Sequence, residues 1–242
     1  MSKKDAIYSV PKSTIGDFSF DEAVVDVFPD MIKRSVPGYS TIIDNIGLIA
    51  QKYALPNTNL YDLGCSLGEA SIVMRRKVSQ DGCKIIAVDN SPAMIEKCER
   101  HLHAFRSNVP VEAVCSDITK ISLENASVVV LNFTLQFIEP ELRRALIESI
   151  YAALKPGGVL VLSEKIRHPN QVGDELLVTL HHEFKRNNGY SELEISQKRS
   201  ALENVMRIDT LEQHDARLKQ AGFTDIVPWF SCFNFSSIVA VK

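Results

Sequence analysis

The stretch that decides the fold is residues 61–70, which read YDLGCSLGEA. Its glycines allow a tight turn between a strand and a helix, and in α/β proteins such a turn holds nucleotides. The segment from Gly64 to Gly68 also fits G-x-S-x-G, the nucleophile elbow of serine hydrolases. Ser66 is therefore either a nucleophile or part of the floor of a nucleotide pocket.

The hydrolase interpretation requires a base and an acid in the right chain order, and an oxyanion loop such as HGGG upstream. No such loop precedes residue 61, and the elbow would follow the first core strand. His214 is the only histidine near the end of the chain, and it lies within a predicted amphipathic helix. The sequence therefore favours the nucleotide interpretation.

Short apolar runs alternate with amphipathic stretches along residues 40–165. The predicted strands are NLYDL, KIIAVD, VEAVCS, SVVVLNF and GVLVLSE. They are nearly continuous apolar runs, which is typical of strands buried on both faces. The predicted helices are residues 40–54, the stretch through Phe105 that begins with Ser91 as N-cap and Pro92, and PELRRALIESIYAAL, which stops at the KPGG turn. Alternating strands and helices predict a parallel sheet with right-handed crossovers.

The C-terminal part breaks this alternation. Residues 166–208 are polar and predicted to be a helical insert. A capping box from Thr210 to Gln213 then predicts a helix ending near Gly222. The last two strand-like runs, DIVPWFS and NFSSIVAVK, are separated by few residues, which favours an antiparallel hairpin.

Acidic residues support the nucleotide interpretation. Asp62 ends the first predicted strand, and Asp89 ends the second at about the spacing from which a carboxylate binds ribose hydroxyls. Gly64 and Gly68 would let a ligand approach the backbone closely. Alternatively, the glycines only turn the chain and Asp89 only caps the helix that follows. Their combination with the ordered strands favours a site.

This pattern resembles the class I S-adenosylmethionine-dependent methyltransferases. The resemblance rests on a strand-end acid before a glycine loop, an acid ending strand two, Asp117-Ile118 ending strand three, Asn132 near the end of strand four, and KPGGVLVLSE. It implies a Rossmann-like, seven-stranded, mostly parallel sheet with one reversed strand. We expect a single domain, 1–242, with a helical N-terminal segment 1–38, a cofactor-binding core 39–165, the helical insert 166–208 after strand five, and a final helix and hairpin 209–242.

The chain resembles more narrowly the carboxy-S-adenosyl-L-methionine synthase family. The matching stretches are Phe28 to Met31, Arg34 to Tyr39, Tyr61 to Gly68, Asn132 to Phe137, Asn188 to Glu194, Ser196 to Arg199, and Trp229 to Phe235. The resemblance implies that prephenate carboxylates the S-methyl group of S-adenosylmethionine and is released as phenylpyruvate. It also implies a homodimer and a functional link to an enzyme that uses the product to carboxymethylate a wobble uridine of tRNA.

The resemblance also assigns the site. Cofactor contacts would come from Tyr39, Gly64, Cys65, Ser66, Asp89, Asn90, Asp117, Ile118 and Asn132, and Arg199 would hold the transferred carboxylate. At residues 68–70 the chain reads Gly-Glu-Ala where relatives often read Gly-Ala-Ala, which puts little in doubt. From the sequence alone Tyr39 is equally a core aromatic. The segment 1–38 would then fold over the site as a lid, since the chemistry must exclude water.

The chemistry implied by the resemblance explains why basic residues are needed. A sulfonium makes the C–H of its methyl group acidic, and prephenate loses a carboxyl group because its ring becomes aromatic. The substrate is a dianion, and the basic candidates of the insert are Lys165, Arg167, His168, His181, His182, Lys185, Arg186, Lys198 and Arg199. The alternative is a solvated helix face, with these charges paired to Glu175, Glu183, Glu192, Glu194 and Glu203. For Arg199 the two interpretations are a carboxylate anchor and a surface pair with Glu203.

Composition sets the remaining expectations. A formal charge of −3 over 242 residues gives no reason to expect direct nucleic-acid binding. The five cysteines at 65, 83, 98, 115 and 232 never form C-x-x-C, so neither a disulfide framework nor a metal site is expected. The N-terminus lacks an apolar leader, and the longest apolar run, around VVVLNF, is too short to span a bilayer. We therefore expect a cytoplasmic protein that does not enter a membrane.

Two other functions stay open on the sequence alone. One is an ordinary small-molecule methyltransferase, which would release S-adenosylhomocysteine and a methylated acceptor. The other is a cofactor-binding module without catalysis, because no catalytic base stands out in the sequence.

Overall fold

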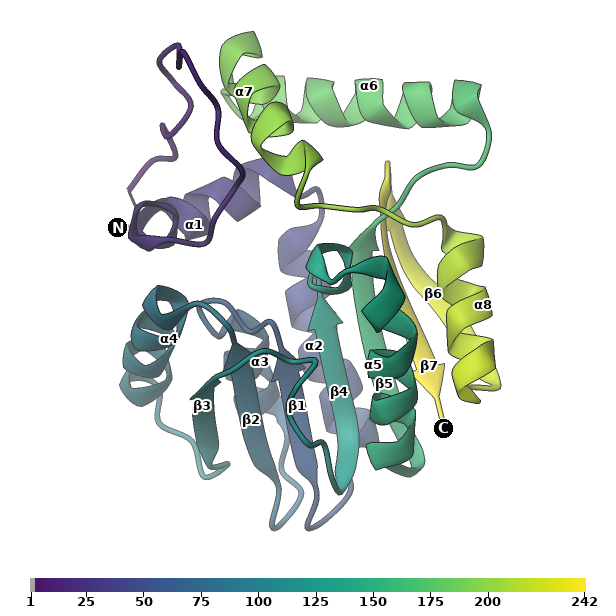
Figure 1. The fold of residues 1–242 in the computed structure, drawn as a ribbon. Helices are drawn as coiled ribbons and strands as arrows, with labels where there is room; N and C mark the ends of the chain where they lie inside the picture. The colour runs from purple at the N-terminus through teal and green to yellow at the C-terminus, as the bar shows by residue number, and fades with distance from the viewer. Residues whose placement is uncertain (1–2) are drawn as a thin grey trace.

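The computed structural model describes residues 3–242 and is built around a seven-stranded sheet. Its strand order is β3-β2-β1-β4-β5-β7-β6 (Figure 1). The strands are β1 (Asn59–Leu63), β2 (Lys84–Asp89), β3 (Val111–Cys115), β4 (Ala126–Asn132), β5 (Leu154–Lys165), β6 (Asp225–Cys232) and β7 (Phe235–Val241). Only β7 among them runs antiparallel to its neighbours, β5 and β6. The predicted sheet with one reversed strand is confirmed.

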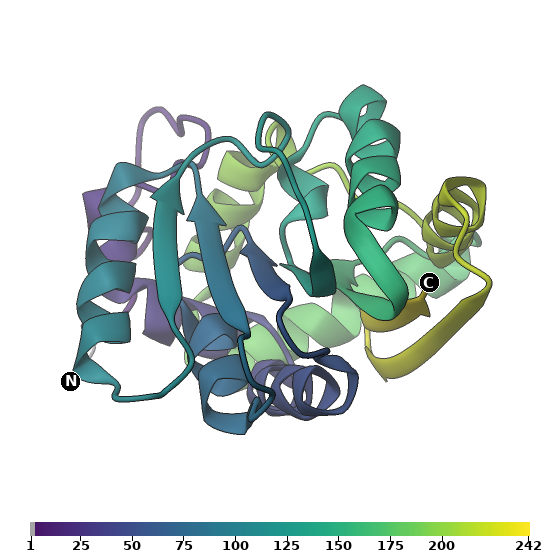
Figure 2. The ribbon, with the colours of Figure 1, turned by 90° about the horizontal axis from the view of Figure 1, so that it is seen from below.

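Helices cover both faces of the sheet (Figures 1 and 2). One face carries α2 (Tyr39–Tyr53), α3 (Glu69–Lys77) and α4 (Pro92–Ala104), and the other carries α5 (Pro140–Ala153) and α8 (Leu211–Ala221). The predicted caps are confirmed, because the Ser91 hydroxyl accepts from the Met94 N–H and Thr210 forms a capping box with Gln213. The α5 helix ends at Ala153, and β5 begins at once, before the KPGG turn predicted to stop the helix.

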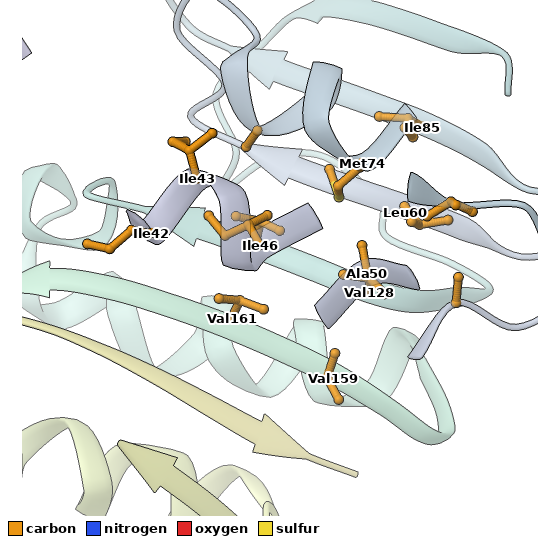
Figure 3. Packing of buried hydrophobic residues seen from close by; sticks show 14 of the residues in the cluster. Ile42, Ile43, Ile46, Ala50, Leu60, Met74, Ile85, Val128, Val159 and Val161 are labelled. Atoms are coloured by element: carbon orange, nitrogen blue, oxygen red, sulfur yellow. The ribbon is translucent and has the colours of Figure 1, made fainter. Parts of the chain in front are cut away.

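Alternating side chains of each central strand enter two different cores. Ile42, Ile46 and Ala50 of α2 pack against Leu60, Val128 and Val161, as Figure 3 shows. The intervening residues of β1 and β4, such as Leu63 and Val129, pack on the opposite face with α5 and α8. The strands are thus buried on both faces, as their continuous apolar runs predicted. Each such fully buried aliphatic side chain contributes roughly 1.5–3 kcal/mol.

A helical cover lies over the carboxyl ends of the strands (Figure 1). It consists of α1 (Glu22–Ser35), α6 (Gln171–Asn187), α7 (Glu192–Glu203) and the irregular segment before α1. The 166–208 insert is helical as predicted, and α7 begins with a capping box between Ser191 and Glu194. Within residues 3–242 no helix is both long and apolar enough to cross a bilayer.

Candidate active site

A cavity of about 380 Å³ opens between the strand ends and the helical cover. It lies where the strand order reverses between β1 and β4, and ligands of open α/β sheets bind at such a point. Nine of the ten residues predicted to form the site line it: Tyr39, Gly64, Cys65, Ser66, Asp89, Asn90, Asp117, Ile118 and Asn132. The structure brings these residues together, and their contacts with a ligand remain a prediction.

The glycine loop after β1 has a conformation that requires glycine. Gly64 and Gly68 both have positive φ, +81° and +82°. A Cβ on Gly64 would lie 2.3 Å from the Thr134 hydroxyl oxygen, and one on Gly68 would lie 2.8 Å from the Cys98 sulfur. The loop therefore packs closely against the neighbouring strand end and α4, which leaves its backbone facing the cavity.

Ser66 is part of this loop, and its hydroxyl lacks the base that a nucleophilic serine requires. Its backbone N–H donates to an Asp89 carboxylate oxygen at 2.9 Å, and its hydroxyl contacts the Met94 sulfur at 3.5 Å. Among residues 3–242 no histidine ring makes a hydrogen bond to the Ser66 hydroxyl. A serine nucleophile needs such a base. The structure supports the interpretation of Ser66 as part of the pocket floor.

Carboxylates form one wall of the cavity, and backbone groups hold them. Asp89 accepts from the N–H groups of Ser66 and Ser91, both at 2.9 Å. Asp62 accepts from the backbone and hydroxyl of Ser71 at 3.0 and 2.7 Å, and burial raises the pKa of Asp62 to about 6. We call the lining carboxylates Asp62, Glu69, Asp89 and Asp117 the acidic wall.

Asp117 occupies the end of the third strand differently. It accepts from the backbone and hydroxyl of Thr119, at 2.9 and 2.7 Å, and these bonds lower its pKa. Ile118 beside it is buried. At the end of β4, the Asn132 amide oxygen is buried without a hydrogen-bond partner in the described chain. Since buried polar atoms are normally paired, this oxygen points to a ligand donor.

Tyr39 begins α2 and lies at the cavity, so it is more than a core aromatic. Its ring lies 6.3 Å from that of Phe133. Burial, and then the Glu69 carboxylate beside it, raises the pKa of the Tyr39 hydroxyl, and burial raises the pKa of Glu69. The hydroxyl therefore stays protonated and can donate. Glu69, where the sequence departs from the expected Ala, lines the same cavity.

The opposite wall is basic and comes from three separate elements. Lys165 at the end of β5, Lys185 on α6 and Lys198 on α7 line the cavity, and we call them the basic wall. Burial lowers their pKa values to about 8, 7 and 8 respectively. Arg186, by contrast, lies on a solvated helix face and pairs there with Glu183 and Glu192, as the alternative interpretation of the insert expected.

Arg199, the tenth predicted residue, lies outside the cavity lining. It is exposed on α7, and within the described chain it forms no ion pair with Glu203. The alternative interpretation, a surface pair with Glu203, is therefore not supported. Its charge contributes to lowering the pKa values of Lys165 and Lys185, so it acts electrostatically on the basic wall.

The N-terminal segment, expected from the sequence to cover the site, lines the cavity through contacts that the sequence did not indicate. Phe18, Phe20 and Phe28 line it, and Asp5 accepts a hydrogen bond from the Tyr190 hydroxyl at 2.5 Å. Asp5 also lies 3.6 Å from the Lys198 ammonium. Asp5 and Tyr190 are 185 positions apart, and Lys198 lies farther along the chain, so no local spacing could have indicated these contacts.

Comparisons with known proteins define the family. A model described as a methyltransferase domain matches residues 60–158. A carboxy-S-adenosyl-L-methionine synthase of Vibrio parahaemolyticus is 61% identical over 241 residues, covering all of this chain and 98% of the relative. A synthase of the same name from Pseudoalteromonas atlantica is 59% identical, with 100% and 99% covered. The chain belongs to the carboxy-S-adenosyl-L-methionine synthase family.

Solved structures of more distantly similar proteins show the same fold. A putative S-adenosyl-L-methionine-dependent methyltransferase from Methanococcus maripaludis matches with a TM-score of 0.60 and 21% identity, covering 96% of this chain and 97% of that one. Human N-acetylserotonin methyltransferase, in complex with SAM, matches with a TM-score of 0.62 and 18% identity, covering 91% and 55%. These likenesses confirm the Rossmann-like class I fold.

The residues present fit S-adenosylmethionine, the compound that the family converts. Asp89 is fixed at the strand end where α/β folds bind ribose hydroxyls. The acidic wall suits a sulfonium and an ammonium, and the unpartnered Asn132 oxygen can accept from the ammonium. Within residues 3–242 there is no group of three or more metal-ligating side chains.

Proposed function

We propose that the protein converts S-adenosyl-L-methionine and prephenate into carboxy-S-adenosyl-L-methionine and phenylpyruvate. One observation carries this proposal: a single cavity has an acidic wall at the strand ends and a basic wall beneath the cover. A cationic cofactor and an anionic carboxyl donor would each find the opposite charge there. An ordinary methyltransferase acting on a neutral acceptor would have no use for three lysines at the cavity, two of them without a partner, because an unpaired charge away from water is costly.

The cofactor would be held along the β1, β2 and β4 ends. Asp89 would accept from both ribose hydroxyls with the lone pairs not used by Ser66 and Ser91. Asn90, Asp117 and Ile118 would surround the base, and Gly64, Cys65 and Ser66 would present backbone to the amino-acid part. Tyr39 and Asn132 would flank the reacting end. This arrangement brings the S-methyl group toward the basic wall.

The protein's own contribution is binding, orientation and exclusion of water. The sulfonium supplies an acidic methyl C–H. Prephenate would lose its ring carboxyl group as carbon dioxide and its ring hydroxyl as hydroxide as the ring becomes aromatic. The hydroxide would take the methyl proton to give water, and the methyl carbon would bond to the carbon dioxide. Carbon dioxide in water would escape or be hydrated, so the two reactants must be held together in a dry site. The lid segment 1–38 would serve this purpose through Phe18 and Phe20, which line the cavity.

We further propose Arg199 as the anchor of the transferred carboxylate. Its guanidinium can make two parallel hydrogen bonds to a carboxylate. Arg199 is exposed and lies outside the cavity lining, and its charge acts on Lys165 and Lys185, so we propose this fork for the rim of the cavity rather than its floor. The carboxylate would then be gripped as it forms.

The remaining proposals concern the setting of the reaction. The product would supply carboxymethyl groups to a cytoplasmic enzyme that modifies the wobble uridine of tRNA.

The protein would work as a homodimer. Val172, Leu176 and Leu180 support this proposal, since they form an apolar stripe on α6 and are 75%, 57% and 38% exposed. Leu176→Glu should convert the dimer to a monomer in light scattering.

Mass spectrometry tests the reaction directly. Purified protein incubated with S-adenosylmethionine and prephenate should yield carboxy-S-adenosylmethionine and phenylpyruvate in equal amounts. Prephenate labelled with ¹³C in the ring carboxyl group should pass the label to the product. Formation of S-adenosylhomocysteine with a methylated acceptor would support an ordinary methyltransferase instead. Tight binding of S-adenosylmethionine without turnover would support a binding module.

A further inference from the structure

The ammonium groups of the basic wall lack partners in the protein. Among residues 3–242, Lys165 and Lys185 form no ion pair, and neither side-chain nitrogen donates a hydrogen bond. Lys185 is only 8% exposed. Each ammonium has three donors, so one buried and one half-buried cation with unused donors face one cavity. Because buried charges are normally paired, these groups indicate an anionic ligand.

Lys198 differs from the other two because the protein holds it in place. Its ammonium donates to the Ser35 hydroxyl at 3.2 Å and lies 3.6 Å from Asp5. The contact with Asp5 offsets one positive charge of the wall. When all three lysines are protonated, three ammonium groups and the Asp5 carboxylate leave two uncompensated positive charges on the basic wall, which matches the charge of a dicarboxylate.

His181 lies near these lysines, but its ring adds no positive charge to the wall. Its Nε2 lies 2.8 Å from the Ser35 carbonyl oxygen, which only accepts, so Nε2 carries the proton. Burial, and then the charges of Lys185 and Lys165, holds the pKa of His181 far below its usual value. The ring is therefore neutral, and its Nδ1 has no proton to donate. Cationic anchoring on this wall comes from the lysines alone.

We propose that Lys165, Lys185 and Lys198 form a subsite that binds both carboxylates of a dicarboxylate second substrate. This inference rests on the proposed function, because it assigns that substrate's charges to particular residues. Lys198 provides a preset anchor. Lys165 and Lys185 gain their partners only when the dianion enters. The subsite thereby selects against monocarboxylates, which leave one buried ammonium unpaired.

Equilibrium binding tests the subsite without turnover. The protein is saturated with S-adenosylhomocysteine, which has no S-methyl group to react, and is titrated calorimetrically with prephenate, a dianion, or phenylpyruvate, a monoanion. Prephenate should bind the parent more tightly than phenylpyruvate. Lys165→Met and Lys185→Met should each weaken prephenate by about 10- to 100-fold, the effect of losing a charged hydrogen-bonding partner.

A matched control lies on the same strand as Lys165. Lys155 is exposed at the opposite end of β5, so Lys155→Met removes the same charge far from the cavity. It should leave prephenate binding unchanged. All three variants should bind S-adenosylhomocysteine like the parent, which shows that the cofactor side stays folded.

The outcomes separate this inference from the proposed function. Equal prephenate affinity in the parent and both cavity variants would overturn the subsite, as would no prephenate binding to the parent. A parallel loss of S-adenosylhomocysteine would show that the lysines only support the fold, and would also overturn it. Lysine-dependent prephenate binding without any carboxy-S-adenosylmethionine formed from S-adenosylmethionine would uphold the subsite and refute the proposed reaction.

Discussion

The acidic and basic walls of the cavity face each other, but they are built in opposite ways. Three carboxylates of the acidic wall lie at or just after the ends of strands β1, β2 and β3, and backbone N–H groups hold them. The lysines of the basic wall come from a strand end and two cover helices, and two of them have no partner in the described protein. One wall is complete in the free protein, whereas the other is completed by a ligand.

This difference assigns different tasks to the two walls. Carboxylates fixed by backbone bonds are preorganised, so they bind a cofactor with little loss of conformational freedom. Unpaired buried lysines hold the protein in a costly state that an anion relieves. We infer that the acidic wall determines cofactor affinity and the basic wall determines which carboxyl donor is accepted. The following predictions test this division.

The largest effect is expected at the acidic wall. Asp89→Asn keeps the shape of the side chain but replaces one acceptor oxygen with an amide donor and removes the charge. Both ribose hydroxyls would lose charge-assisted hydrogen bonds of roughly 1.5–3 kcal/mol each, so S-adenosylmethionine affinity should fall by at least about 100-fold. Isothermal titration calorimetry measures this loss.

A control is needed because Asp89 also anchors Ser66 and Ser91. Thermal unfolding should show whether the loop has been lost together with the ligand. Asp81→Asn, in the turn before the same strand, should change neither quantity. Unchanged cofactor affinity in Asp89→Asn would remove Asp89 from the site and break the proposed division of tasks.

The second prediction concerns the pH dependence of the basic wall. Burial, and then the charges of Lys198, Lys165 and Arg199, lowers the pKa of Lys185 to about 7. The free protein therefore loses this proton as pH rises through 7, whereas the complex with a dianion retains it. Binding must then take up a proton, and between pH 7 and 9 prephenate affinity should fall by up to about tenfold per pH unit for each lysine that takes up a proton, Lys165 and Lys198 included.

Measuring the proton uptake on prephenate binding identifies the group that causes the pH dependence. Prephenate titrations in two buffers of different ionisation enthalpy should show uptake near pH 8, and Lys185→Met should reduce it. Burial also raises the pKa of Glu164 to about 8, and this carboxyl accepts from the Leu135 and Gln136 N–H groups. Equal uptake in parent and variant would assign the pH dependence to Glu164 or another group.

The two walls also differ in how far the sequence predicted them. Asp62, Asp89 and Asp117 each end an apolar run, so strand order alone predicted that they would meet at one sheet edge. Lys185 lies next to Arg186 in the sequence, yet one side chain enters the cavity and the other pairs on the surface. That distinction depends on how α6 lies on the core. Likewise, Asp5 and Lys198 meet only because the N-terminal segment crosses α7.

A third, smaller effect is expected at the rim of the basic wall. Arg199→Lys keeps the charge but loses the planar fork. Carboxy-S-adenosylmethionine affinity should fall by about tenfold, corresponding to one charge-assisted hydrogen bond, while S-adenosylmethionine affinity and the thermal midpoint stay nearly constant. Paired calorimetry with both ligands measures the difference. Equal losses for both would make Arg199 a general structural support, and no loss would place the carboxylate anchor among the lysines.

The smallest effect is expected at Ser66, in the loop that raised the hydrolase alternative. Ser66 contributes its backbone N–H to Asp89, whereas its hydroxyl makes only the 3.5 Å contact with the Met94 sulfur. Ser66→Ala keeps the backbone bond, so cofactor affinity should fall by about threefold or less, equivalent to well under one ordinary hydrogen bond.

Gly64, in the same loop, provides the comparison for the small effect expected of Ser66→Ala. Gly64→Ala is also a small change in the loop, since it adds one methyl group. That Cβ would lie 2.3 Å from the Thr134 hydroxyl oxygen, at a φ of +81°. It should therefore weaken cofactor binding clearly more than Ser66→Ala does, because the loop must move away from β4. If the loop acts through its backbone shape, Gly64 matters and the Ser66 hydroxyl does not. A serine-reactive phosphonate should then leave the parent protein unlabelled, whereas a stoichiometric adduct on Ser66 would mean that its hydroxyl is an activated nucleophile.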